Sequence, residues 1–491
     1  MTAAVPGCDA GPVAHPPRRG GPLDDTLDET RDRPGSDGDG DGVAPVLVMV
    51  WSRDEPQRCG EAVHVPPVAG EHYTIGRAVD VDDDGAVPLS FGQLRPSGRV
   101  DTGPLLSARI SRRQLAISHE PGGGLRVEQI GRSTLRLDGH AMTTGVIHPG
   151  GLVEVENRLL LLYTGRPAAW LRARPPGADG FAFGAADPWG IVGESPAAWE
   201  LRAQIARLAT RDEHVLVLGP SGSGKELVVQ AIHARSRRAR APLVSRNAAT
   251  IPEALIDAEL FGNLRNYPNP GMAERPGLLG EADGGALFLD EVGELSQQLQ
   301  AHLLRVMDSG EYQRLGEARV RRADLRLLAA TNRDPAGLKH DFLARFTHRL
   351  TVPGLGDRPE DIVLIAHHLL RTIAASAPEL AAADALALAP ELVSALLGFR
   401  FTTHVRELRE LLWRALPHRD GDALGLPPGL LQLARPRPDA AEPPQGHGTL
   451  TREAVLAALA RCDGVKETAW RELGLRNRYQ LNRALKKLGV E

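Results

Sequence analysis

A glycine-rich stretch, residues 219–226, directly follows the short apolar run 215–218 and has the spacing G-x-x-x-x-G-K. Such a stretch at the start of a helix lets backbone N–H groups converge on phosphate oxygens, and the helix dipole favours negative charge there. The lysine adds a positive charge for the β- and γ-phosphates of a nucleotide. We therefore predict a phosphate-binding loop, the alternative being a plain glycine-rich turn. Its residues are Gly219, Pro220, Ser221, Gly222, Ser223, Gly224, Lys225 and Glu226.

Two neighbouring carboxylates, Asp290 and Glu291, follow the apolar run 286–289. At the end of a buried strand, one carboxylate can bind Mg²⁺ and a second can orient and deprotonate a water molecule. We expect Asp290 to bind Mg²⁺, directly or through water, and Glu291 to activate the water that attacks ATP. Acidic residues at strand ends are common, so this prediction depends on the glycine-rich loop upstream. Glu226 replaces the Ser or Thr whose hydroxyl usually contacts the metal.

The elements that must hold these side chains can be read from composition. The chain has 491 residues, enough for three or four domains. Residues 45–166 are short apolar runs broken by Gly, Pro and Asp, which predicts a β-sandwich. Residues 189–356 alternate strand and helix patterns, which predicts an α/β core, and 357–420 carry helical patterns, which predicts a helical lid. Linkers are predicted at 167–188 and 421–448, before a small all-α domain at 449–491.

Whole-chain properties exclude several classes of protein. Residues 1–44 are rich in Gly, Pro and Asp, which predicts a disordered segment without the apolar stretch of a secretory signal. No run is long enough to span a membrane. The cysteines Cys8, Cys59 and Cys462 lack the spacing of a disulfide framework or zinc site, so we expect a cytoplasmic protein. The net charge of −4 indicates little about partners.

Residues 189–416 resemble the AAA+ domain of sigma-54-dependent bacterial enhancer-binding regulators in the order and spacing of their motifs. The motifs are residues 191–195, 219–233, 259–262, 284–291, 303–306 and 329–332. In that family Glu commonly follows the loop lysine, which accounts for Glu226. The resemblance implies an ATPase that converts ATP and water to ADP and phosphate. It also implies assembly into a homo-oligomeric ring, expected as a hexamer, whose target is RNA polymerase with sigma-54.

The same resemblance implies roles for further residues. Asn247 matches an asparagine that restrains the catalytic glutamate, and Thr331 with Asn332 matches the sensor of the γ-phosphate. Arg406 matches the sensor arginine of the lid. Arg345 matches an arginine finger, which would stabilise transition-state charge at the nucleotide of a neighbouring subunit. Taken singly, each could instead be a surface ion pair or a helix cap.

The sequence departs from the family pattern at two places. Lys339 stands where members usually carry a second finger arginine, and lysine cannot offer a planar fork of donors. Residues 263–272 replace the Gly-Ala-Phe-Thr-Gly-Ala loop that contacts the sigma factor, and they include Pro268 and Pro270. Tyr267 is the one aromatic residue that could form a tip there. This replacement puts the contact with sigma-54 in question.

The chain ends resemble two binding modules. Residues 449–491 resemble a Fis-type helix-turn-helix, whose last helix enters the major groove of DNA, the alternative being a solvated basic helix in a small bundle. The candidate DNA contacts are Arg476, Arg478, Tyr479, Asn482, Arg483 and Lys486.

The predicted sandwich resembles a forkhead-associated (FHA) domain, a β-sandwich that binds phosphothreonine. Arg77 and Ser111 match the positions that grip phosphate, and Arg112 lies beside them. Gln114 stands where the family has a structural histidine, and residues 133–135 replace an Asn-Gly pair that holds the peptide backbone. A protein-interaction sandwich that has lost the phosphopeptide is the alternative.

Together these expectations describe an ATP-hydrolysing, DNA-binding transcription regulator that receives a signal from a phosphothreonine protein. One alternative is a nucleotide-gated DNA-binding regulator that does not remodel sigma-54 RNA polymerase because its sigma-contact loop is replaced. Another is a signalling scaffold that binds phosphopeptide and nucleotide without hydrolysis.

Overall fold

The computed structural model describes residues 42–430 apart from 69, 79–84, 122, 175–178, 377–385 and 422. Most of the predicted disordered segment 1–44, the greater part of the linker 421–448 and the whole domain 449–491 lie outside the described residues. The same is true of the six candidate DNA contacts between Arg476 and Lys486. Within the described ranges, every helix is too short or too polar to cross a bilayer.

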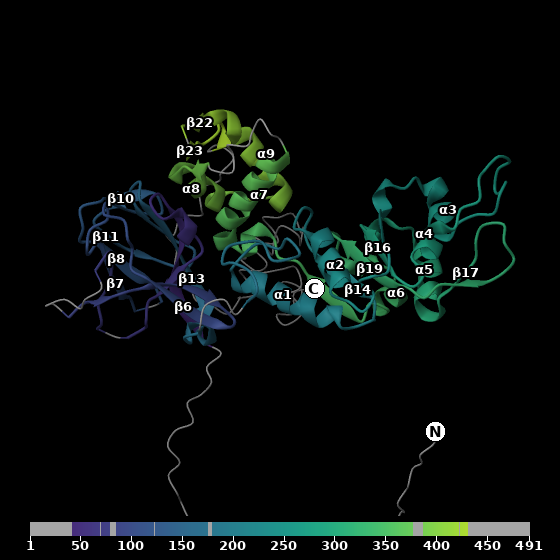
Figure 1. Ribbon diagram of the computed structural model, residues 1–491, viewed down its shortest axis with the longest axis horizontal. Helices are drawn as coiled ribbons and strands as arrows, with labels where there is room; N and C mark the ends of the chain where they lie inside the picture. Colours follow the sequence, from purple (N-terminus) through teal and green to yellow (C-terminus); the bar gives the residue numbers. More distant parts are fainter. Residues whose placement is uncertain are drawn as a thin grey trace, which may run out of the picture. The chain divides into compact units, whose positions relative to one another are not determined.

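The N-terminal region is β-rich, as predicted, and consists of two sheets (Figure 1). One sheet has the order β10 (His140–Met142), β9 (Leu135–Leu137), β12 (Leu152–Val155), β13 (Leu159–Pro167), β1 (Val43–Ser52), β2 (Ala62–His64), β5 (Phe91–Arg95) and β6 (Gly98–Gly103). The other has the order β11 (Thr144–Ile147), β8 (Leu125–Gln129), β7 (Leu115–His119), β3 (Tyr73–Ile75) and β4 (Val87–Pro88).

The two sheets share one apolar core, so this region is a sandwich. Leu47 and Met49 of β1 belong to the same buried cluster as Ile75 of β3 and Ile117 of β7. Side chains alternate between the faces of a strand, so the intervening residues of β1 point away from this core. Those residues are also buried, because a second apolar cluster covers the outer face of the sheet.

The central region is an α/β domain built on a parallel sheet, which confirms the predicted α/β core. The strand order is β15 (Leu243–Asn247), β16 (Ala286–Asp290), β19 (Arg326–Thr331), β14 (Val215–Leu218) and β20 (His348–Thr351). The helices are α1 (Pro196–Ala209), α2 (Lys225–Ala234), α3 (Ile256–Phe261), α4 (Gly277–Glu281), α5 (Gln297–Ser309) and α6 (His340–Ala344). A short hairpin joins β17 (Glu311–Tyr312) to β18 (Arg321–Arg322).

Helices cover both faces of this sheet, as a parallel sheet requires. Val215, Val217 and Phe288 pack in a cluster with residues of α1 and α2. Leu216 and Leu287, one position along in each strand, pack in the opposite cluster with residues of α3–α6. Both faces of the strands are therefore apolar, and polar side chains gather at the strand ends.

The lid that follows is mainly helical, with α7 (Ile362–Ser376), α8 (Pro390–Gly398) and α9 (His404–Ala415). It also contains a small sheet that the sequence pattern did not predict, with the order β21 (Ala387–Leu388), β23 (Ala423–Leu424) and β22 (Arg419–Asp420). Each of these strands has two residues, so tertiary pairing rather than local propensity creates them.

The predicted linker 167–188 contains ordered, packed residues. A 3-10 turn, η2 (Ala168–Leu171), follows β13, and Ala173 forms a bridge with Arg99 of β6. Further along, Phe181 stacks on Trp199 of α1 with ring centroids 5.8 Å apart. As a domain boundary the linker stays a prediction, but these residues contact the elements on both sides.

Candidate nucleotide-binding site

The phosphate-binding loop predicted at 219–226 connects β14, which lies inside the parallel sheet, to the N-terminus of α2. Gly224 caps α2 with a backbone φ of +103°, a conformation that side-chain-bearing residues rarely adopt. Gly222 approaches the lid so closely that a Cβ there would lie 2.1 Å from the carbonyl oxygen of Thr403. The glycines therefore permit both the turn and the contact with the lid.

Lys225 is buried, and its ammonium group donates to backbone carbonyl oxygens of its own loop. Its Nζ donates to the carbonyl oxygens of Gly219 at 3.0 Å and Pro220 at 3.3 Å, and it lies 3.9 Å from Oε1 of Glu291. A phosphate oxygen could take the place of these carbonyl acceptors. The lysine is thus held where a bound phosphate would meet it.

The two carboxylates lie at the carboxyl end of β16, between the ends of β15 and β19. Oδ1 of Asp290 accepts from the backbone N–H of Glu291 at 3.0 Å, and Oδ2 accepts from Nδ2 of Asn247 at 3.4 Å. Oε2 of Glu291 accepts from the backbone N–H of Asn332 at 3.2 Å. Asn247 thus contacts the carboxylate next to the one it was expected to restrain, and its regulatory role stays a prediction.

Glu291 has a strained backbone, with φ +52° and ψ +45°. For a residue other than glycine, such a conformation costs of the order of 1–3 kcal/mol and persists only where the surroundings fix it. Residues of this kind cluster at functional sites, which supports a special role for this carboxylate. Thr331, at the end of β19, is buried, and its hydroxyl accepts from the backbone N–H of Arg333 at 3.1 Å.

A cavity of about 510 Å³ lies between the core and the lid and connects these groups. Loop residues 221–226 and both carboxylates line its polar end. Ile191, Val192, Ile365 and Leu369 give it an apolar end. A site of this size with an apolar pocket and a few converging polar groups is typical of small-molecule binding.

The two predicted arginines occupy different places. Arg406 of α9 lines the cavity, and its Nη1 donates to Oγ of Ser221 at 3.3 Å, so it links the lid to the loop. Arg345 lies outside the cavity lining, where its exposed guanidinium pairs with both carboxylate oxygens of Asp308 in α5. Lys339 precedes α6, and its backbone N–H donates to Oε1 of Gln300. The structure therefore gathers the predicted nucleotide residues apart from Arg345.

A magnesium ion bound with a nucleotide typically takes one or two protein carboxylates and completes its shell with phosphates and water. Asp290 supplies one such carboxylate beside the loop, so the site fits this mode of binding. In the part of the chain that the structure describes, no three His, Cys, Asp or Glu residues group into a metal cage. Glu226 is exposed and accepts from Nε2 of Gln230 at 3.3 Å.

The sequence did not reveal that Arg358 and His368 line the cavity. Arg358 is buried at the start of the lid, and its Nη1 donates to the carbonyl oxygen of Val192 at 3.4 Å. Burial and the neighbouring Arg371 lower the pKa of His368. The available signal was the charged segment 358–361, which precedes an apolar helix. That pattern is equally typical of a helix cap, so it did not predict that Arg358 lines a cavity.

The predicted phosphopeptide residues lie on adjacent loops of the sandwich. The backbone N–H of Arg77 donates to the carbonyl oxygen of Ser111 at 3.3 Å, and both Arg77 and Arg112 are exposed. Gln114 is buried; its Oε1 accepts from the N–H of Ser111 at 3.4 Å and its Nε2 donates to the carbonyl oxygen of Ser133 at 2.9 Å. Gln114, at the position where the FHA family has its histidine, thus connects the loop of Ser111 to the segment that contains Ser133.

The loop 263–272 that replaces the sigma-contact motif is anchored at its base. Asn263 is fully buried and exchanges backbone hydrogen bonds with Arg275. At its tip, the half-exposed ring of Tyr267 covers Gly316, whose added Cβ would lie 2.7 Å from the ring. The loops that follow α3 and β17 extend at the same end of the α/β domain (Figure 1).

The parallel sheet, the glycine-rich loop, the paired carboxylates and the helical lid define an AAA+ domain. A family profile described as the Sigma-54 interaction domain matches residues 191–355. The transcriptional regulatory protein ZraR of Escherichia coli K12 is 36% identical over 300 residues, which cover 59% of this chain and 67% of that protein.

Longer similarity connects the chain to the nitric oxide reductase transcription regulator NorR1 of Cupriavidus necator. The two are 33% identical over 496 residues, which cover 88% of this chain and 93% of NorR1. A solved structure of NtrX from Brucella abortus in complex with ATP is 31% identical, covers 61% of this chain and 69% of that chain, and has a TM-score of 0.44. The chain belongs to the family of sigma-54-dependent transcriptional regulators.

Proposed function

We propose that this protein is an ATP-hydrolysing regulator that acts on transcription by RNA polymerase with sigma-54. The observation that carries the proposal is the convergence of Lys225, Asp290 and Glu291 at the polar end of one cavity, with Nζ of Lys225 3.9 Å from Oε1 of Glu291. A phosphate-binding lysine and two carboxylates at this range are the parts that hydrolysis of a nucleoside triphosphate requires.

In the proposed reaction, the phosphates of ATP enter between the loop and the carboxylates. Lys225 exchanges its bonds to the carbonyls of Gly219 and Pro220 for bonds to phosphate oxygens. Glu291, oriented by the N–H of Asn332, accepts a proton from water as the water oxygen attacks the γ-phosphorus. The bond from that phosphorus to the β–γ bridging oxygen breaks, and ADP leaves. Mg²⁺, held by Asp290, would neutralise charge on the β- and γ-phosphates.

The proposal extends to a ring, expected as a hexamer, in which Arg345 of one subunit reaches the nucleotide of the next. The exposure of Arg345 and its place outside its own cavity are consistent with that role. Asn332 and Arg406 would report the state of the nucleotide to the core and the lid. Specific binding of DNA is proposed for residues 449–491.

The test of this proposal uses the complete chain and Lys225→Ala. We expect the wild type to bind ATP with Mg²⁺ and the variant to lose binding, because the positive charge beside the phosphates is gone. Gln230→Ala, on the exposed face of α2, is the matched control and should bind like the wild type. Equal ATP affinity in wild type and Lys225→Ala would refute the assigned site.

The proposed input is a phosphothreonine protein that binds Arg77, Ser111 and Arg112. We predict that Arg77→Ala lowers the affinity for a phosphothreonine peptide below detection in calorimetry, because a phosphate depends on charge-assisted bonds to arginine. Arg126→Ala is the control, since Arg126 forms an exposed ion pair with Glu120 on the same sandwich. Peptide affinity that survives in Arg77→Ala would reject the assignment.

A second candidate function follows from the loop 263–272. A regulator whose Tyr267 tip does not engage sigma-54 would still hydrolyse ATP and bind DNA. Open-complex formation with sigma-54 holoenzyme, ATP and the purified chain separates the two. ATP-dependent opening that Tyr267→Ala abolishes supports remodelling, whereas steady hydrolysis without opening supports the second candidate.

A further inference from the structure

The outer face of the larger sandwich sheet is buried against the lid. Val46, Val48 and Val50 of β1 and Leu160 and Leu162 of β13 point away from the sandwich core. They belong to one continuous apolar cluster with residues of α7, α8 and α9. The sandwich is therefore packed on the ATPase domain through apolar surface, which is the main source of free energy in such contacts.

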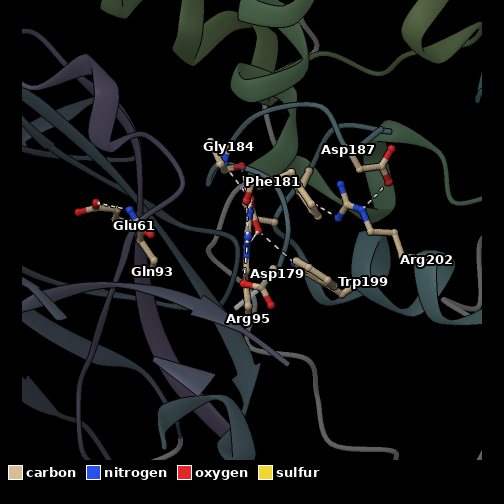
Figure 2. Close-up of polar contacts among 12 residues, drawn as sticks. Glu61, Gln93, Arg95, Asp179, Phe181, Gly184, Asp187, Trp199 and Arg202 are labelled. Atoms are coloured by element: carbon tan, nitrogen blue, oxygen red, sulfur yellow. Dashed lines mark hydrogen bonds and ion pairs between the residues drawn. The ribbon is translucent and has the colours of Figure 1, made fainter. Parts of the chain in front are cut away.

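Arg95 of the sandwich reaches the α/β core. Arg95, at the end of β5, forms a two-pronged ion pair with Glu194, from Nε to Oε2 at 2.9 Å and from Nη2 to Oε1 at 2.6 Å. The guanidinium also donates to Oδ2 of Asp179 and to the carbonyl oxygens of Phe181 and Ala182, and Figure 2 shows Arg95 beside Asp179 and Phe181. The side chains of Arg95 and Glu194 are 3% and 2% exposed, so water does not compete for these bonds.

Glu194 is itself fixed from several directions. Its carboxylate also accepts from the N–H of Gly184 at 2.8 Å and from Nε1 of Trp199 at 3.0 Å. Ile191 and Val192, which precede Glu194 by three and two residues, line the apolar end of the nucleotide cavity. The pair with Arg95 thus holds the backbone segment that forms this wall.

The lid is attached to the sandwich by polar contacts as well. Nη1 of Arg166 in β13 donates to Oε1 of Glu360 at 2.8 Å, with both side chains almost fully buried. Nε1 of Trp51 in β1 donates to the carbonyl oxygen of Leu388 at 2.6 Å. The sandwich therefore holds the core at Glu194 and the lid at Glu360 and Leu388.

The core and the lid also meet directly at the same place. Oδ1 of Asp361 accepts from the backbone N–H groups of Glu194 at 2.8 Å and Ser195 at 3.0 Å. Asp361 directly follows Glu360, and Glu194 is the partner of Arg95. The sandwich therefore contacts both sides of this direct connection between core and lid, at Glu194 and at Glu360.

We propose that Arg95 is a positioning residue of the nucleotide site, and that the sandwich fixes the core and the lid in the arrangement that binds nucleotide. The inference rests on the proposed nucleotide site between them. The sandwich bridges the core and the lid through the ion pairs of Arg95 and Arg166, so loss of either pair weakens this bridge and loosens the lid relative to the core. The binding-competent fraction then falls, and the apparent dissociation constant rises in proportion.

The test measures binding of the fluorescent nucleotide mant-ADP by the complete chain. Arg95→Met removes the ion pair with the core, and Arg166→Met removes the ion pair with the lid. We expect each to raise the dissociation constant about 5- to 10-fold, within the usual range of coupling between sites. Since the bridge needs both ion pairs, one substitution already opens it, and the double variant should bind no more weakly than the weaker single variant.

A kinetic readout separates positioning from general damage. Arg95 touches neither the loop nor the carboxylates, so Arg95→Met should raise the KM for ATP and leave kcat within about twofold. Arg136→Met is the matched control, because Arg136 forms a half-exposed ion pair with Glu156 on the same sheet. It should match the wild type in both measurements.

Three outcomes are decisive. If the wild type does not bind mant-ADP, the proposed nucleotide site fails. If the wild type binds and the single variants bind equally well, the inference fails while the site stands. A double variant weakened by the product of the single effects also overturns the inference, because independent connections add in free energy. If the Met variants do not fold, Arg95→Lys and Trp51→Phe carry the same expectations. Arg95→Lys keeps the positive charge but loses the two-pronged ion pair, and Trp51→Phe keeps an aromatic ring but loses the N–H that donates to Leu388.

Discussion

At the scale of single residues, the candidate site depends on how Glu291 is held. Its backbone adopts a left-handed conformation, and its carboxylate receives one N–H from Asn332 while the ammonium of Lys225 lies within 3.9 Å. Because the carboxylate is already oriented in the folded protein, little conformational entropy is lost when it binds a water molecule beside a phosphate. The same geometry explains why the glutamate follows the strand end instead of belonging to the strand.

One histidine makes the stability of the α/β core depend on pH. Nδ1 of His214 accepts from the N–H of Leu327 at 3.0 Å, and Nε2 faces the carbonyl oxygen of Met307 at 3.4 Å. This pattern requires a neutral ring, and burial lowers the pKa of His214. The unfolded chain therefore binds the proton more readily than the folded chain does. The stabilisation is complete above the ordinary histidine pKa of about 6.5 and is lost as the pH falls through the folded-state pKa.

We predict that His214→Asn, which keeps an acceptor for Leu327, reduces the loss of unfolding free energy between pH 7.5 and 5.5. Urea denaturation of the wild type and the variant at both pH values measures this difference. His140→Asn, at an exposed position, is the control and should leave the loss unchanged. An equal loss in the wild type and His214→Asn would contradict the prediction.

Residue types and spacing predicted the groups that converge at the cavity, because Lys225, Asp290 and Glu291 lie in short local motifs. Arg95 and Glu194 could not be predicted in this way. They are separated by 99 residues, and nothing local distinguishes a buried interdomain arginine from a surface one. Asn247 was expected to restrain Glu291, but its side chain donates to Asp290, because the register of β15 against β16 places the two residues opposite each other.

At the scale of elements, the glycine-rich loop connects the core with the lid. Gly222 lies against the backbone of Thr403, and the N–H of Val405 donates to the carbonyl oxygen of Gly222 at 3.1 Å. Arg406 then reaches Ser221. The N-terminus of α9 therefore contacts the loop directly.

We predict that Gly222→Ala weakens nucleotide binding by about tenfold or more. The new Cβ would lie 2.1 Å from the carbonyl oxygen of Thr403, and the φ of +74° costs a side-chain-bearing residue roughly 1–2 kcal/mol. Titration with mant-ADP measures the change. Gly337→Ala is the control, because its Cβ would meet open space. Unchanged affinity in Gly222→Ala would show that the contact between loop and lid does not matter for binding.

Most elements were predictable because their patterns are local. The alternation of apolar strands and amphipathic helices between 189 and 356 predicted the parallel core. The two-residue strands of the lid and the packed residues of the 167–188 segment were not predicted. Their order comes from partners far along the chain, such as Arg95 with Phe181 and Ala182, and not from their own composition.

At the scale of the whole molecule, the described part of the sandwich packs on both the α/β core and the lid. One apolar cluster joins β1 and β13 to the lid helices, and the pair of Arg95 with Glu194 joins the sandwich to the core. A ligand at the loops of Arg77 and Ser111 would therefore bind a domain that contacts both the core and the lid. Transcription, the process that the family regulates, is what the proposed coupling would control.

The release of inorganic phosphate from ATP by the complete chain with Mg²⁺ tests the central claim most directly. We predict turnover by the wild type and a fall of about 10²- to 10⁴-fold in Glu291→Gln, the usual contribution of a general base. Glu291→Gln should still bind mant-ADP, and Glu294→Gln, at an exposed position nearby, should hydrolyse ATP like the wild type. Equal phosphate release by the wild type and Glu291→Gln, or none above background by the wild type, would contradict the account.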